Sequence, residues 1–134
     1  MNFREATSED IDYMATHSTN QTVDRKLSDV IDYAYALEDE TLLVIGGFRM
    51  IVPTTAWCWI NLTEEAKKNI YTTYRVILEW IDEFVYTHDV KRLQAFVKDI
   101  PSHIRLVEHL GFEKESKMKN FYGDEDAYLY ARIF

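Results

Sequence analysis

The chain has 134 residues, of which 47% are hydrophobic and 14% aromatic, and its formal net charge is −8. This length and composition predict a single globular domain spanning residues 1–134 and exclude a disordered chain. The negative charge argues against a broad phosphate-neutralising surface, so we expect no nucleic-acid partner.

A single cysteine, Cys58, excludes a disulfide framework, and no spacing of histidine, cysteine or carboxylate residues indicates a metal site. The sequence shows neither a secretory leader nor an apolar run of transmembrane length. We therefore expect a protein of a reducing intracellular compartment, with no metal and no membrane contact.

The N-terminal part is predicted to form a strand followed by two helices. Residues 1–6 form the strand, and Ser8 caps a helix that ends near His17, with acidic residues in its first turn. Asp24 caps a second helix. The residues that would share its apolar face are Leu27, Ile31, Ala34 and Tyr35.

Three strands are predicted next. Residues 41–45 are a continuous apolar run, and residues 48–52 return from it. Gly46-Gly47 between them indicates a two-residue hairpin turn, because both central positions of a type I′ turn need a positive φ. The third strand covers residues 55–62.

The longest predicted helix begins at Thr63, which can cap it, and ends near His88. Apolar residues recur along this segment at helical spacing, which predicts one face directed at a core. These residues are Ile70, Tyr74, Ile77, Leu78, Ile81, Phe84 and Val85.

The C-terminal part reads as one supersecondary unit. Residues 92–97 alternate between polar and apolar, as a half-buried strand does. A short helix from Ser102 to Leu110 follows, and Gly111 ends it because glycine adopts the left-handed conformation without steric cost. Residues 112–119 and 125–133 are predicted to be two final strands.

This order, β-α-α-β-β-β-α-β-α-β-β, resembles the GCN5-related N-acetyltransferase (GNAT) fold. The most specific piece is the short helix and its Leu-Gly-Phe ending, from Ser102 to Phe112. The resemblance implies an α+β protein, with four helices and a central mixed sheet of six to seven strands.

Two segments, Cys58–Thr63 and Ser102–Arg105, resemble a smaller acetyltransferase-like family of tailed bacteriophages, some of whose members are internal virion proteins. This resemblance implies a phage-encoded protein of the bacterial cytoplasm, associated with the virion or its assembly. It implies an acyl-CoA-dependent N-acetyltransferase that uses acetyl-CoA to acetylate an amine of a small molecule or protein. The alternative is a catalytically inactive GNAT-like protein that binds a phage or host protein.

In GNAT enzymes a loop with the pattern Arg/Gln-x-x-Gly-x-Gly/Ala, just before the long helix, binds the pyrophosphate of the cofactor. The matching stretch here, residues 61–68, contains no glycine and has two acidic residues at the helix start. The resemblance assigns cofactor contacts to Leu62, Thr63, Glu64, Glu65, Lys67, Lys68, Ser102 and Arg105.

The tyrosine that protonates the leaving thiolate in many GNAT enzymes would stand four residues before Gly111, where this chain has Val107. Candidate bases are His17 and the acidic run Glu38–Glu40, but none has the spacing of a catalytic motif. The sequence therefore assigns no catalytic residue. It also leaves open whether CoA binds, which amine or partner is recognised, and the oligomeric state.

Overall fold

The structure is a computed structural model that describes residues 2–17 and 33–134. The chain divides into two compact units, and each is described by itself below. Unit 1 comprises Met1–Arg49 and Cys58–Thr73, and unit 2 comprises Met50–Trp57 and Tyr74–Phe134.

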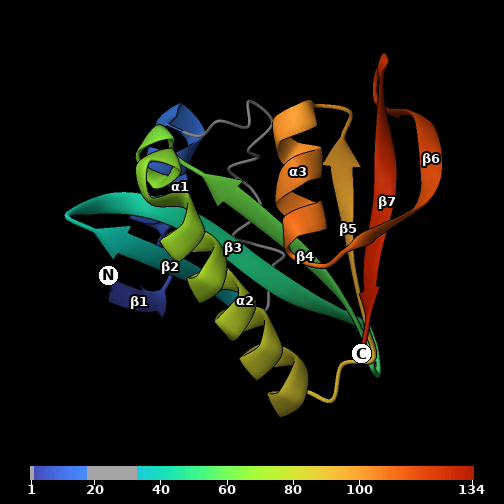
Figure 1. The fold of residues 1–134 in the computed structure, drawn as a ribbon, viewed down its shortest axis with the longest axis horizontal. Coiled ribbons are helices and arrows are strands. Elements are labelled where there is room, and N and C mark those ends of the chain that lie inside the picture. Colours follow the sequence, from blue (N-terminus) through green and yellow to red (C-terminus); the bar gives the residue numbers. More distant parts are fainter. Residues whose placement is uncertain (1, 18–32) are drawn as a thin grey trace. The chain divides into compact units, whose positions relative to one another are not determined.

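Seven strands and three α-helices lie in the described residues (Figure 1). The strands are β1 (Asn2–Glu5), β2 (Tyr33–Asp39), β3 (Thr41–Val52), β4 (Thr55–Leu62), β5 (Arg92–Lys98), β6 (Glu113–Tyr122) and β7 (Glu125–Ile133). The helices are α1 (Ser8–His17), α2 (Ile70–Thr87) and α3 (Pro101–His109), with a 3-10 helix, η2 (Glu64–Asn69), directly before α2.

The sheet has the strand order β1-β2-β3-β4-β5-β7-β6. β4 and β5 pair in parallel, whereas β1 with β2, β2 with β3, β5 with β7, and β6 with β7 pair antiparallel. The mixed sheet that the sequence predicts is therefore confirmed, and its seven strands fall at the upper end of the predicted number. None of the helices in the described residues is long and apolar enough to cross a membrane.

The second predicted helix is wrong at its C-terminal end. Ala34 and Tyr35 lie in β2, where they pair with Gly47 and Gly46 of β3. The alternation of aromatic and small residues in this segment suits a pleated strand better than a helix. The rest of that predicted helix, from Asp24 to Ile31, lies outside the described residues, so three of the four predicted α-helices are seen.

The predicted hairpin turn at Gly46-Gly47 is also wrong, because β3 runs through both glycines without a break. The chain reverses instead at Glu40 and Thr54, which have φ values of 66° and 71°. Gly47 is needed for packing: a Cβ there would lie 2.7 Å from Trp59 Nε1 and 2.7 Å from the Tyr33 carbonyl oxygen.

The core of unit 1 joins α1 to the strands. Ile11 and Met14 of α1 are buried against apolar residues of β2 and β3, namely Ala36, Leu42 and Ile45. Thr7, rather than the predicted Ser8, caps α1. Its N–H donates to Asp10 Oδ2 over 2.8 Å, and the Asp10 N–H donates back to Thr7 Oγ1 over 3.4 Å.

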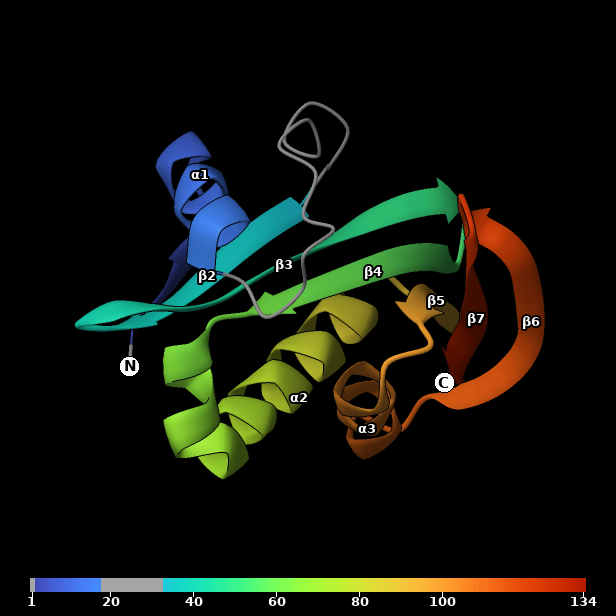
Figure 2. The ribbon, with the colours of Figure 1, turned by 90° about the horizontal axis from the view of Figure 1, so that it is seen from above.

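In unit 2 the predicted alternation of β5 is confirmed, since Leu93, Ala95 and Val97 are buried. α3 packs against β5 (Figure 2). The end of α3 also follows the prediction. Gly111 has a φ of 88°, and the N–H groups of Gly111 and Phe112 donate to the carbonyl oxygens of Glu108 and Val107. This is the Schellman arrangement of a helix C-terminus.

Replacing Gly47→Ala should lower the free energy of unfolding by about 1–3 kcal/mol, because the added methyl group overpacks β3. The combined change Gly47→Ala with Trp59→Leu should be less destabilising than the sum of the two single changes, since the indole contact is gone. Urea unfolding of the three variants measures this coupling.

Gly123→Ala is the control, because no atom lies within 4 Å of a Cβ at that turn position. Its effect should not depend on residue 59. If the effect of Gly47→Ala were equally independent of residue 59, the packing role of Gly47 would be contradicted.

Candidate functional site

The eight predicted cofactor contacts lie in two places. Six of them are consecutive or nearly so, at the junction of β4 and η2 in unit 1. Ser102 and Arg105 lie on α3 in unit 2. The local geometry of each place decides which groups a ligand could reach.

Thr63 occupies the N-cap position of η2, as predicted, but its side chain makes no capping hydrogen bond. Its hydroxyl donates to the Leu42 carbonyl oxygen over 2.9 Å, and its N–H donates to the Leu43 carbonyl oxygen over 2.9 Å. Thr63 is buried, and the start of η2 receives no side-chain hydrogen bond. The predicted side-chain cap is therefore wrong: a polar group buried against a strand pairs with that strand's carbonyls rather than with the next turn.

Two of the backbone N–H groups at this junction are already used within the chain. The Thr63 N–H is bonded to Leu43, and the Ala66 N–H donates to the Thr63 carbonyl oxygen over 3.1 Å. The N–H groups of Glu64 and Glu65 donate to no turn or loop carbonyl of the described residues, so they are open to a ligand. They belong to a 3-10 helix, not to the first turn of an α-helix, and the hydrogen-bond geometry of a 3-10 helix is poorer.

The two lysines of η2 are paired with its two acids. Lys67 Nζ lies 3.4 Å from Glu64 Oε1, and Lys68 Nζ lies 2.9 Å from Glu65 Oε1. Two cations and two anions cancel, so the turn offers no net positive charge. Exposed pairs at this spacing contribute only about 0.2–0.5 kcal/mol each, so a bound anion could separate them.

Ser102 does not cap α3. The N-cap is Ile100, with a φ of −123°, and Pro101 occupies the first helical position, so Ser102 is an exposed residue inside the helix. The N–H groups of His103 and Ile104 both donate to the Ile100 carbonyl oxygen over 3.0 Å. The exposed Arg105 forms no ion pair with any residue that the structure describes, in contrast to Lys67 and Lys68.

Val107 is half-buried and brings no hydroxyl to α3. The fully buried Tyr130 has a hydroxyl that finds no hydrogen-bond partner in the described part of the chain. Burial raises the pKa of Tyr130, and the nearby Glu108 carboxylate raises it further. Tyr130 therefore stays protonated at neutral pH, but its hydroxyl is closed off from a ligand.

Cys58 is no nucleophile, because burial raises the pKa of its thiol to about 12. Within residues 2–17 and 33–134, no group of three or more histidine, cysteine, aspartate or glutamate side chains could hold a metal ion.

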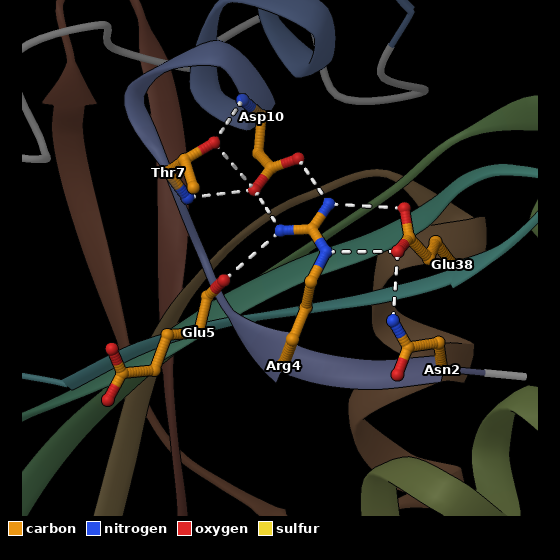
Figure 3. Close-up of polar contacts among 6 residues, drawn as sticks. All are labelled: Asn2, Arg4, Glu5, Thr7, Asp10 and Glu38. Atoms are coloured by element: carbon orange, nitrogen blue, oxygen red, sulfur yellow. Dashed lines mark hydrogen bonds and ion pairs between the residues drawn. The ribbon is translucent and has the colours of Figure 1, made fainter.

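A polar network surrounds Arg4, and the sequence does not predict it (Figure 3). Arg4 donates to both Asp10 carboxylate oxygens, over 2.7 Å and 2.8 Å. Its Nε and Nη2 donate to Glu38 over 3.0 Å and 3.2 Å, and Asn2 donates to the same carboxylate over 3.0 Å. The network joins β1, α1 and β2 through residues up to 36 positions apart, which no local sequence pattern reveals.

This network argues against Glu38 as a catalytic base. The hydrogen bond from Arg4 holds the pKa of Glu38 below its usual range, and the bond from Asn2 acts in the same direction. A base that works near neutral pH needs a pKa close to neutrality, so the lowered pKa makes Glu38 a poor proton acceptor.

Among residues 2–17 and 33–134, the other candidate bases make no contact typical of a catalytic base. Asp39 ends β2, and Glu40, with a φ of 66°, forms the turn to β3. His17 stacks on Tyr13 at the end of α1, with ring centroids 3.9 Å apart. Its Nδ1 lies 2.9 Å from the Tyr13 carbonyl oxygen.

In unit 2 the parallel ladder between β4 and β5 covers three residue pairs, from Thr55 with Arg92 to Trp57 with Gln94. β5 continues for four more residues, Ala95–Lys98, which pair with β7 but have no registered partner in β4.

No protein-family profile matches the sequence, and no curated protein does. Solved structures do match. The ribosomal-protein-S18-alanine N-acetyltransferase from Escherichia coli has a TM-score of 0.76 at 16% identity, over 98% of this chain and 92% of that one. The chain has the fold of the GNAT N-acetyltransferases.

Two further structures agree. The ribosomal-protein-alanine N-acetyltransferase from Brucella melitensis has a TM-score of 0.71 at 17% identity, over 100% of both chains. A GNAT-family acetyltransferase from Bacillus anthracis has a TM-score of 0.74 at 13% identity, over 98% of this chain and 93% of that one. At these identities the likeness establishes the fold.

Asp10→Asn should remove about 2–3 kcal/mol from the free energy of unfolding at neutral pH, because it breaks a charge-assisted pair with Arg4. The pKa of Asp10 is lowered, chiefly by its hydrogen bond from Arg4. Asp10 therefore stabilises the folded state at pH values above its pKa in the unfolded chain. This stabilisation is lost as the pH falls through the pKa of Asp10 in the folded protein. Denaturant unfolding between pH 7 and pH 3 measures both effects.

The control is Glu9→Gln, which removes an equal charge from an exposed neighbour on the same helix turn. It should leave the stability and its acid dependence nearly unchanged. If Asp10→Asn kept the acid dependence of the original protein, the assigned role of Asp10 would be wrong.

Proposed function

We propose that this chain is an acyl-CoA-dependent N-acetyltransferase of phage type, made in the bacterial cytoplasm, that acetylates an amine on a small molecule or a protein. The observation that carries the proposal is a fold match over nearly the whole chain to N-acetyltransferases.

The proposed reaction moves an acetyl group from sulfur to nitrogen. The amine loses a proton, its nitrogen forms a bond to the thioester carbonyl carbon, the carbon–sulfur bond breaks, and the thiolate takes up a proton. Acetyl-CoA is a substrate in this reaction, and no metal is required.

The chain's own groups fit donor binding only in part. The N–H groups of Glu64 and Glu65 could donate to phosphate oxygens, and the backbone of Leu62 and Thr63 would position them. Lys67 and Lys68 would contribute only after leaving their glutamate partners. On α3, Ser102 and Arg105 are both exposed, and Arg105 forms no ion pair with any described residue, so each could meet a ligand.

Calorimetric titration with acetyl-CoA and with CoA tests the proposal. Binding is expected, and Arg105→Ala should weaken it at least about tenfold, the effect of one lost hydrogen bond to a charged group, about 1.5 kcal/mol or more. Lys119→Ala, which removes an equal charge from exposed β6, is the control and should leave the affinity unchanged. No heat at millimolar ligand would refute donor binding.

Val107→Tyr should raise kcat by up to about 100-fold if the chain is an enzyme, because it would supply a proton for the leaving thiolate. Val107→Phe adds a ring of similar size without the hydroxyl, so it is the matched control and should not raise kcat. Acetyl transfer to a panel of amines, followed by mass spectrometry, measures the effect. Equal rates for the two variants would contradict a proton-donating role at this position.

The second candidate is a catalytically inactive GNAT-like protein that binds a phage or host protein in the virion or during assembly. Three observations favour it: residues 61–68 lack glycine, the lysines of η2 are neutralised, and Val107 replaces a tyrosine. This candidate predicts a stable partner in pull-downs from phage-infected cells and no acetyl transfer. Turnover by the isolated chain would exclude it.

A further inference from the structure

Four aromatic side chains of unit 2 contact one another in a continuous row. The ring centroids of Trp57 in β4 and Phe96 in β5 are 4.0 Å apart, and those of Phe96 and Phe121 in β6 are 4.6 Å apart. The rings of Phe121 and Tyr122 follow at 4.9 Å. These four residues all belong to unit 2, and together they form what we call the aromatic surface.

The aromatic surface lies on the face of the sheet opposite α3. Arg132 of β7 pairs with Leu93 of β5 and donates to the Leu110 carbonyl oxygen at the end of α3, over 3.4 Å. Directly paired residues point to the same face, so α3 covers the face that carries Leu93. Side chains alternate between faces along a strand, which places Phe96 on the other face.

The aromatic surface is open to solvent. Phe121 is 40% exposed, and Trp57, Phe96 and Tyr122 are half-buried. Single exposed aromatic residues are common on protein surfaces, whereas a connected apolar patch is typical of a binding site.

The charged residues on this face of β5 stand at the two ends of the strand and are already paired. Lys98 Nζ lies 2.8 Å from a carboxylate oxygen of Glu125. Arg92 donates to Glu115 over 2.8 Å and to the side chain of Gln94 over 2.9 Å. Because each cation has its own anion, the aromatic surface favours a ligand without charge.

The rings of the aromatic surface are steeply inclined to one another. The interplanar angles along the row are 88° between Trp57 and Phe96, 50° between Phe96 and Phe121, and 87° between Phe121 and Tyr122. A flat ligand, such as one sugar ring, could stack on only one of these rings at a time. Inclined rings suit a chain whose bulky groups turn about its axis, as prolines do in a polyproline II helix.

The polar groups of the aromatic surface fit the same kind of ligand. The indole N–H of the half-buried Trp57 donates to no residue that the structure describes. A polyproline II segment has backbone carbonyl oxygens without internal hydrogen bonds, so it can accept from such a donor. β5 is paired with β7 along residues 92–98, so a ligand on this face meets side chains rather than a free strand edge.

We propose that the aromatic surface binds an uncharged, proline-rich segment of another protein. The prolines lie against the inclined rings, and a backbone carbonyl oxygen of the segment accepts a hydrogen bond from Trp57 Nε1. Aromatic-lined surfaces bind such segments well because the polyproline II conformation is already formed in the free ligand. This binding does not depend on acyl transfer.

The fluorescence anisotropy of fluorescein-labelled decaproline, titrated with the whole chain, tests the proposal. Saturable binding is expected with a dissociation constant below about 1 mM. Raising the salt concentration from about 50 to about 200 mM should change this constant less than about twofold, because no charge is neutralised on binding. A labelled glycine–serine peptide of the same length should not bind.

Two variants test the assigned contacts. Phe121→Ala should weaken decaproline binding at least about tenfold, because it removes an exposed ring from the middle of the row. Trp57→Phe keeps a ring but removes the N–H, and should weaken binding about fivefold. The control is Tyr86→Ala, which removes a 90% exposed aromatic side chain of α2 in the same unit and should leave binding unchanged.

The proposal would be overturned if decaproline did not saturate the protein, or if Phe121→Ala and Trp57→Phe both bound as tightly as the original protein. Calorimetric binding of cellohexaose without binding of decaproline would assign the aromatic surface to a carbohydrate and overturn the proposal too. Trp57→Phe decides the question if Phe121→Ala does not fold. Titration with acetyl-CoA tests acyl transfer separately, so either result can fail alone.

Discussion

The inward hydrogen bonds of Thr63 fix the junction on which the donor-binding account depends. Both its hydroxyl and its N–H are directed at carbonyl oxygens of β3, within unit 1. This anchoring removes one amide from the set that a ligand could use and leaves η2 without a side-chain cap. The same anchoring presents Glu64 and Glu65 to solvent, where they neutralise the two lysines that follow.

Sequence patterns predicted an element correctly where its conformation depends on neighbouring residues in the chain. Gly111 ends α3 as expected, because a left-handed residue is needed there whatever surrounds it. Sequence patterns failed where a contact with a residue distant in the sequence determines the conformation. Gly46 and Gly47 satisfy the preferences of a turn, yet the indole of Trp59, twelve positions after Gly47, requires glycine in a continuous strand. Three strands were predicted between α1 and α2, and three are found, but two of the predicted strands are the single strand β3 and the third strand found is β2.

At the candidate site, too, the features set by the local sequence were predicted and those set by tertiary contacts were not. The missing loop glycine and Val107 are visible in the sequence, and both set this chain apart from the usual GNAT pattern. The side chain of Thr63 does not cap η2 as expected, because its hydroxyl bonds to β3. The α3 helix begins one residue before the predicted Ser102, because Pro101 takes the first helical position. The Arg4 network, which withdraws Glu38 from the candidate bases, depends on contacts 34 residues apart and has no sequence signal.

Backbone amide resonances from NMR spectroscopy test the central claim most directly. On addition of acetyl-CoA, the resonances of Glu64 and Glu65 should shift, while the Thr63 amide should remain protected from hydrogen exchange with and without ligand. Unchanged resonances across residues 62–65 at saturating acetyl-CoA, or rapid exchange at Thr63, would contradict the account.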